Sequence, residues 1–196
     1  MLHLDFSDFS LIEYLALPEL PGCPRATIRE TAALVFADFC GITQCFKERL
    51  EMIIETDVSE YDLVSPHDQT MVIGVAAVDV GGRPLIPGDY TADSPSRIVF
   101  AAGIAGVAKI TLILKSTLDA VSAPADILNR WAEVIAHGVK FRLLLMPDKP
   151  WSNPQLAGHY RSEYDRECSR VASDVRNEFS VSRHGRAGFT YSVYGV

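Results

Sequence analysis

A histidine followed by an aspartate, His67-Asp68, is the pair of residues in this chain best suited to chemistry. A carboxylate beside an imidazole can orient the ring, which is one requirement of a histidine that acts as a general base. The pair follows Pro66 in a turn-like loop, and no nucleophile stands in a recognisable setting near it. Adjacent loop residues rarely point the same way, and a triad is defined by geometry. A small ligand-binding module or hydrolase that uses the His67 loop therefore stays open only as an alternative.

Metal ligands are the second kind of chemistry to consider. The four cysteines are Cys23, Cys40, Cys45 and Cys168. Four residues separate Cys40 from Cys45, and no second Cys or His pair stands at zinc spacing, which favours buried thiols in a reducing cytosol. His137 and His159 fall on helical patterns and are interpreted as helix-face residues. The sequence thus predicts no catalytic residue, no metal and no cofactor, and we expect a protein that is not an enzyme.

Composition narrows the class of protein further. The chain has 196 residues, 48% of them hydrophobic and 22% charged, which is ordinary for a globular protein. Its net charge of −7 argues against a nucleic-acid-binding surface spread over the whole molecule. The longest apolar run, residues 71–78, is far shorter than the ~20 residues of a membrane span. No basic stretch precedes the first apolar residues, so no secretory signal is expected and no membrane partner is predicted.

The elements that must position these residues are read from hydrophobic periodicity. A 3.6-residue period over 24–46, 125–146 and 153–178 predicts three helices. Between them, residues 48–118 alternate with a period of two and predict about six short antiparallel strands, arranged as a small sandwich or barrel. The predicted fold class is α+β: a helical bundle of three main helices with an inserted antiparallel β-rich lobe and extended N- and C-terminal arms.

A rigid corner is predicted between the second and third helices, over residues 147–160. Pro150 cannot continue a helix, because it lacks an N–H and clashes with the preceding turn. Asn153 followed by Pro154 is typical of an N-cap and first helical residue. Trp151 lies in the bend and is large enough to fix the angle between the two helices.

The two ends of the chain carry opposite charge. Residues 1–23 form an acidic arm, which packs either on a partner chain or on its own domain. The tail, 179–196, is basic and rich in glycine, and it has too little apolar mass for a core of its own. We expect it either to be disordered or to dock on a neighbouring subunit through Arg183, Arg186, Phe189, Tyr191 and Tyr194.

Several short sequence motifs follow one another along residues 24–178. They are Thr27-Ile28-Arg29-Glu30-Thr31-Ala32, Tyr61-Asp62-Leu63, Gly82-Arg83-Pro84-Leu85, Trp131 with Ala136-His137-Gly138, and Lys149-Pro150-Trp151-Ser152-Asn153-Pro154 with Leu156-Ala157. In this order the chain resembles the head-to-tail adaptor proteins of tailed phages, which include gatekeeper and tail tubular proteins. The strand region is shorter and richer in glycine than that family's pattern.

The resemblance implies an adaptor domain over 24–178, a helical bundle with a β-rich insertion, that assembles as a ring of twelve identical subunits beneath the portal protein. It also makes the portal protein a candidate surface on which the tail docks. Such a ring continues the channel through which genomic DNA passes without specific binding, and it receives the tail tube, nozzle or other tail component. The implied location is the virion, at the head–tail interface, after assembly in the host cytoplasm. A tail-completion or tail-terminator ring is the alternative within virions.

Overall fold

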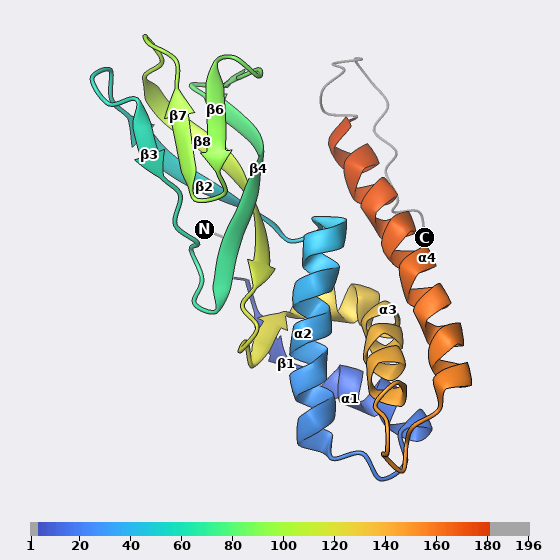
Figure 1. Cartoon of the computed structure of the whole chain (residues 1–196). Coiled ribbons are helices and arrows are strands. Elements are labelled where there is room, and N and C mark those ends of the chain that lie inside the picture. The colour runs from blue at the N-terminus through green and yellow to red at the C-terminus, as the bar shows by residue number, and fades with distance from the viewer. Residues whose placement is uncertain (1–3, 181–196) are drawn as a thin grey trace, which may run out of the picture.

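The structure, a computed structural model, describes residues 4–180 and is a mixed α+β fold with four α-helices and several antiparallel sheets in that range. The helices lie together on one side of the molecule, and most strands extend away from them (Figure 1). The helices are α1 (Ser10–Ala16), α2 (Arg25–Thr43), α3 (Ala125–Leu144) and α4 (Pro154–Ser180), with a 3-10 helix, η1 (Leu17–Glu19), after α1.

The strands in the described range form three antiparallel sheets. A four-stranded sheet has the order β2-β8-β4-β5, a three-stranded sheet the order β3-β7-β6, and β1 pairs with β9. Their bounds are β1 (Phe6–Asp8), β2 (Lys47–Ile54), β3 (Glu60–Asp62), β4 (Thr70–Val80), β5 (Arg83–Pro84), β6 (Tyr90–Ser94), β7 (Arg97–Phe100), β8 (Gly106–Ser116) and β9 (Ser122–Pro124). The predicted alternation is confirmed, but β6 and the β1–β9 pair were missed because neither is an alternating apolar run.

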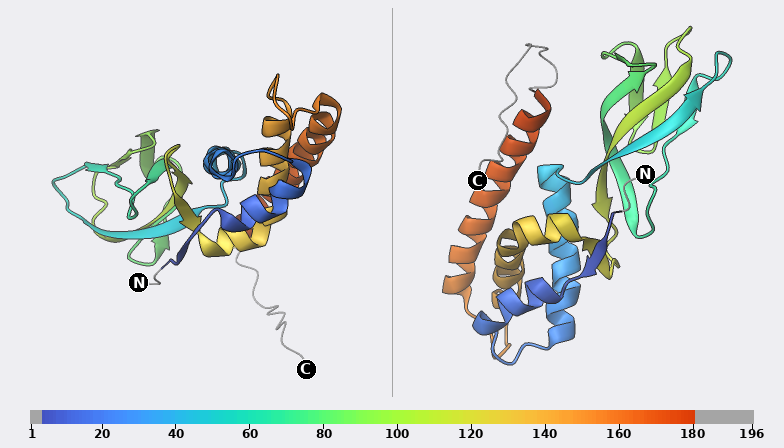
Figure 2. Two further views of the ribbon diagram at one scale, coloured as in Figure 1. Left: turned by 90° about the horizontal axis from the view of Figure 1, so that it is seen from below. Right: turned by 180° about the vertical axis from the view of Figure 1, so that it is seen from behind.

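Helix α2 lies at the centre of the molecule, between the sheets and the other helices (Figure 2). Its apolar stripe is buried as expected: Ile28, Val35 and Phe39 have no exposed surface. The stripe ends earlier than the sequence indicated, since Ile42 is 54% exposed and Gln44 closes the helix in a left-handed conformation. The buried residues of helices and strands join in one hydrophobic cluster, so both parts share a core.

The acidic arm belongs to this core rather than to a partner chain. Phe9, Ile12 and Leu20 are buried against the chain's own helices. Glu13, on α1, is also buried, and its carboxylate contacts Arg29 at 2.5 Å and Arg25 at 3.3 Å. Of the two interpretations of residues 1–23, packing on the same domain is therefore the one that the described part of the arm adopts.

A close approach at Gly138 brings three helices together. A Cβ atom at this position of α3 would lie 2.5 Å from Val35 Cγ1 on α2 and 2.9 Å from the ring of Tyr164 on α4. Real Cβ atoms are essentially never this near to other heavy atoms, so the packing requires glycine. The usual helix penalty of glycine is offset here by the close packing that it permits.

We therefore expect Gly138→Ala to destabilise the protein by about 1–3 kcal/mol, because overpacking outweighs the better helix propensity of alanine. The matched control is Gly158→Ala on α4, where an added Cβ meets nothing within 4 Å. That variant should be stabilised by up to about 1 kcal/mol. Urea denaturation of both variants measures the difference, and equal stabilisation by the two changes would contradict this packing.

Candidate functional site

The corner between α3 and α4 is built around Asn153. Its backbone N–H donates to the Leu144 carbonyl at 2.9 Å, which satisfies one of the unpaired carbonyls at the end of α3. Its side-chain Oδ1 accepts a hydrogen bond from the Leu156 N–H at 3.1 Å, and α4 begins at Pro154. The predicted N-cap is thus present, and one residue joins the end of one helix to the start of the next.

Trp151 fills the inside of this corner. The side chain is buried, with 9% exposure, and it belongs to the main hydrophobic cluster. Its indole N–H has no hydrogen-bond partner within residues 4–180. The ring therefore contributes by packing, and Pro150 precedes it outside either helix.

A buried ionic contact reinforces the corner from the N-terminal side. The Lys140 ammonium lies 3.2 Å from Glu19 Oε1, and the Tyr160 hydroxyl donates to the same oxygen at 3.0 Å. Lys140 is 7% exposed, and its charge lies 4.9 Å from the centre of the Tyr160 ring. Burial, with the Glu19 carboxylate, raises the pKa of Tyr160. Periodicity did not reveal this cluster, because its members lie far apart in sequence.

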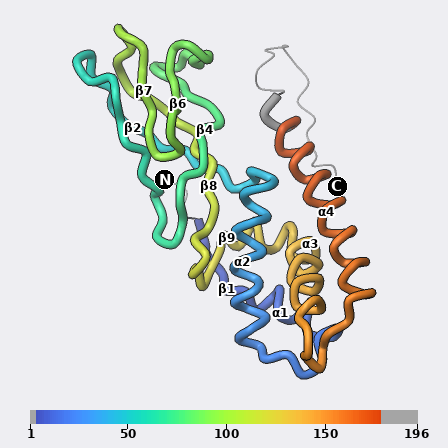
Figure 3. Tube along the Cα trace, viewed as in Figure 1, coloured from blue at the N-terminus to red at the C-terminus, as the bar shows by residue number. Residues whose placement is uncertain are grey.

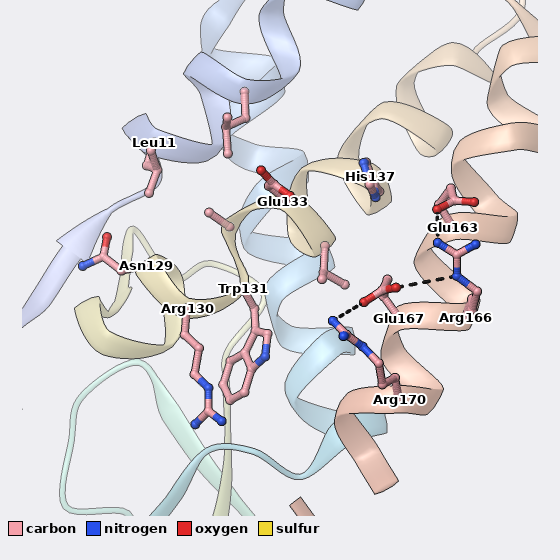
Figure 4. A pocket seen from close by; sticks show the side chains of 13 residues that line it. Leu11, Asn129, Arg130, Trp131, Glu133, His137, Glu163, Arg166, Glu167 and Arg170 are labelled. Carbon is pink, nitrogen blue, oxygen red and sulfur yellow. Dashed lines mark hydrogen bonds and ion pairs between the residues drawn. The ribbon is translucent and has the colours of Figure 1, made fainter. Parts of the chain in front are cut away.

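A cleft of about 700 Å³ opens between α1, α3 and α4 (Figure 4). Side chains from the three helices face it: Leu11 from α1, Trp131, Glu133 and His137 from α3, and Glu163, Arg166, Glu167 and Arg170 from α4. Trp131 lies inside the helix predicted over 125–146, but it is half-buried and interrupts α3 with non-helical torsions, φ −125° and ψ 25°. The kink places its ring at the wall of the cleft.

The charged side chains of α4 that line the cleft form ion pairs with one another. Arg166 contacts both Glu163 and Glu167, and Arg170 Nη2 lies 2.6 Å from Glu167 Oε2 (Figure 4). Such pairs between exposed arginines and half-buried glutamates stabilise a helix weakly, and they also present both signs of charge along one face. This arrangement suits contact with a polar protein surface.

His137 also lines this cleft, and the centre of its ring is 5.4 Å from the centre of the Tyr160 ring. Its Nδ1 atom is buried without a hydrogen-bond partner among the described residues. Burial, followed by the charge of Lys140, lowers the pKa of His137 below 6.5. The neutral ring is therefore the form that the fold favours.

His67 pairs with the carboxylate of Glu48 and not with that of its neighbour Asp68. Its Nε2 atom lies 2.5 Å from Glu48 Oε2, and its ring packs on Phe6 at 5.2 Å between centroids. The contact joins the loop before β4 to β2 and to the N-terminal strand. His67 does not line the cleft between α1, α3 and α4. The neighbouring Asp68 is not the group that orients it.

The four cysteine thiols differ in their burial. Cys23, Cys40 and Cys168 are buried as free thiols, whereas Cys45 is only half-buried and forms a hydrogen bond with Cys40. That hydrogen bond lowers the pKa of Cys45, and burial raises that of Cys40. The five predicted docking residues Arg183, Arg186, Phe189, Tyr191 and Tyr194 lie outside the described residues.

Within residues 4–180, no three His, Cys, Asp or Glu side chains are grouped so that they would hold a metal ion. In the same range, no helix has both the length and the apolar character needed to cross a membrane. No family model matches this sequence, and no curated protein matches it.

The first test of the corner is Trp151→Ala, which should lower the free energy of unfolding by about 3–5 kcal/mol because it leaves a large cavity. Trp151→Phe should cost clearly less, since the indole N–H that it removes makes no hydrogen bond. Denaturation midpoints measure both effects. A loss below about 1 kcal/mol for the alanine variant would show that the ring is peripheral.

A second test uses pH. Because the pKa of His137 is lowered in the folded protein, the unfolded chain binds that proton at a higher pH. The contribution of neutral His137 to stability is fully present above pH 6.5 and is lost as the pH falls toward its folded pKa. The difference in unfolding free energy between wild type and His137→Gln should therefore change below pH 6.5 and stay constant above it. A difference independent of pH would contradict the assignment.

Proposed function

We propose that this protein is a head-to-tail adaptor of a tailed phage. Identical subunits form a ring of twelve beneath the portal protein, continue the DNA channel and receive the tail tube, nozzle or other tail component. Each subunit is a helical bundle of three main helices, α2, α3 and α4, with an inserted antiparallel β-rich lobe between α2 and α3. It acts without catalysis, metal or cofactor, at the head–tail interface of the virion.

The observation that carries this proposal is the order and separation of the elements. β2 leaves the end of α2, and β8 leads back through β9 to α3, so the strands between them extend to one side of the helices (Figure 3). The corner then folds α4 back along α3. This order agrees with the one that the resemblance implies, and it gives one subunit two separate regions for contacts with its neighbours.

The surfaces of both regions support assembly. At the end of the four-stranded sheet away from the helices, Ile53 and Val107 are cross-strand partners with 71% and 51% of their surface exposed. An exposed apolar pair of this kind suits a contact with another protein. On α4, the alternating charges suit a polar lateral contact between subunits.

The net charge agrees with a passive DNA channel. A subunit of charge −7 has little attraction for the phosphate backbone. A channel built from such subunits would let the genome pass without holding it. Binding energy is then concentrated at the protein–protein contacts.

The test is binding of the full chain to purified portal rings from the phage genome that encodes it. We expect the protein to co-sediment with portal rings and to saturate at one subunit per portal subunit. The chain that ends at Phe179 should fail to attach and should melt at nearly the same temperature, because the buried residues of the described core all precede that position.

Two outcomes would overturn the proposal. Binding to the ends of purified tail tubes and not to portal rings would instead support the tail-terminator alternative. Undiminished portal binding by the shortened chain would show that the tail is not the docking element. Circular dichroism of both chains confirms that any lost binding is not a loss of fold.

A further inference from the structure

A second cavity, of about 560 Å³, lies between the start of α1, the N-terminal half of α2 and the loop from β8 to β9. We call it the α2–β9 groove. Phe9, Ala33 and Ala120 are buried at its base. Leu118 and Val121 line it with 65% and 69% of their surface exposed, which is unusual for large apolar side chains beside one another.

The groove has an acidic rim. Asp8, Glu30 and Asp119 line it, and all three are exposed. Hydrogen bonds from Ser10 lower the pKa of Asp8, and one from Thr117 lowers that of Asp119, so both carboxylates are charged at neutral pH.

The cation that lines the groove is already paired. Arg29 contacts the buried carboxylate of Glu13 at 2.5 Å. The apolar groove therefore presents net negative charge at its edge, and its complement is a segment that combines positive charge with large apolar side chains.

The chain itself contains such a segment. Residues 181–196 include Arg183, Arg186, Phe189, Tyr191 and Tyr194 and no acidic residue. We propose that this C-terminal tail binds in the α2–β9 groove of a second copy of the chain, with its aromatic side chains on the apolar floor and its arginines at the acidic rim. The inference rests on the proposed ring, because a closed ring gives every tail one neighbouring groove.

The position of the groove relative to α4 favours binding of the tail to a second copy of the chain rather than to its own copy. β1 and β9, beside the groove, lie across α2 from α4 (Figures 1 and 2). The groove also lies along the first half of α2, whereas α4 runs from the corner past the other end of α2 (Figure 1). The 16 residues after Ser180 span at most about 58 Å when extended. That reach suits an adjacent subunit, whereas the chain's own groove requires the tail to turn back around the helices.

The experiment places the photo-crosslinker p-benzoylphenylalanine at position 191 of the full chain, in place of Tyr191. Irradiation of the concentrated protein should give crosslinked dimers, with the crosslink mapped by mass spectrometry to α2 or to the loop at residues 117–121. The dimer yield should rise with protein concentration. The double change Glu30→Arg and Asp119→Arg should reduce it at least tenfold, and so should Arg183→Glu with Arg186→Glu.

The matched control reverses two exposed acids in the strand-rich part, Asp57→Arg and Asp93→Arg, and should leave the dimer yield unchanged. Crosslinks within one chain, crosslinks mapped elsewhere, or an equal loss in the control would each overturn the inference. The readout needs no portal protein. A chain that forms these dimers but ignores portal rings would therefore refute the proposed function and leave the tail–groove contact standing.

Discussion

The contact of α3 with α2 and α4 at Gly138 is the constraint on which the helical part depends. Since a methyl group at that position would meet Val35 and Tyr164, the three helix axes can approach only around a glycine. The corner at Trp151 and Asn153 fixes the start of α4 close to the end of α3. Two of the surfaces proposed for assembly, the charged face of α4 and the α2 wall of the α2–β9 groove, lie on helices fixed in this way.

The sequence predicted the parts of this fold that periodicity and local chemistry encode. The stripe through Ile28, Val35 and Phe39, the cap at Asn153 and the alternating strands all appear as expected. Features set by tertiary contact were missed. Trp131 breaks its helix although its neighbours keep a helical period, and the arm around Phe9 packs on the core although its composition is acidic.

The candidate site was harder to predict for the same reason. His67 pairs with the carboxylate of Glu48, 19 residues away, and Glu19 of the N-terminal arm pairs with Lys140 of α3. Long-range pairs leave no spacing signal in a single sequence. The α2–β9 groove likewise joins three separate segments. The composition of the sequence identified the tail. Only the structure shows that the acidic residues of those three segments line one groove, which is the proposed binding site of the tail.

We propose that this chain is a phage adaptor, and electron cryomicroscopy of intact particles that contain the chain tests this claim most directly. The account predicts a ring of this protein between the portal and the tail, with helices and strand-rich lobes as described here surrounding the DNA channel. A junction built wholly from other proteins, or density for this chain only at another level of the tail, would contradict it.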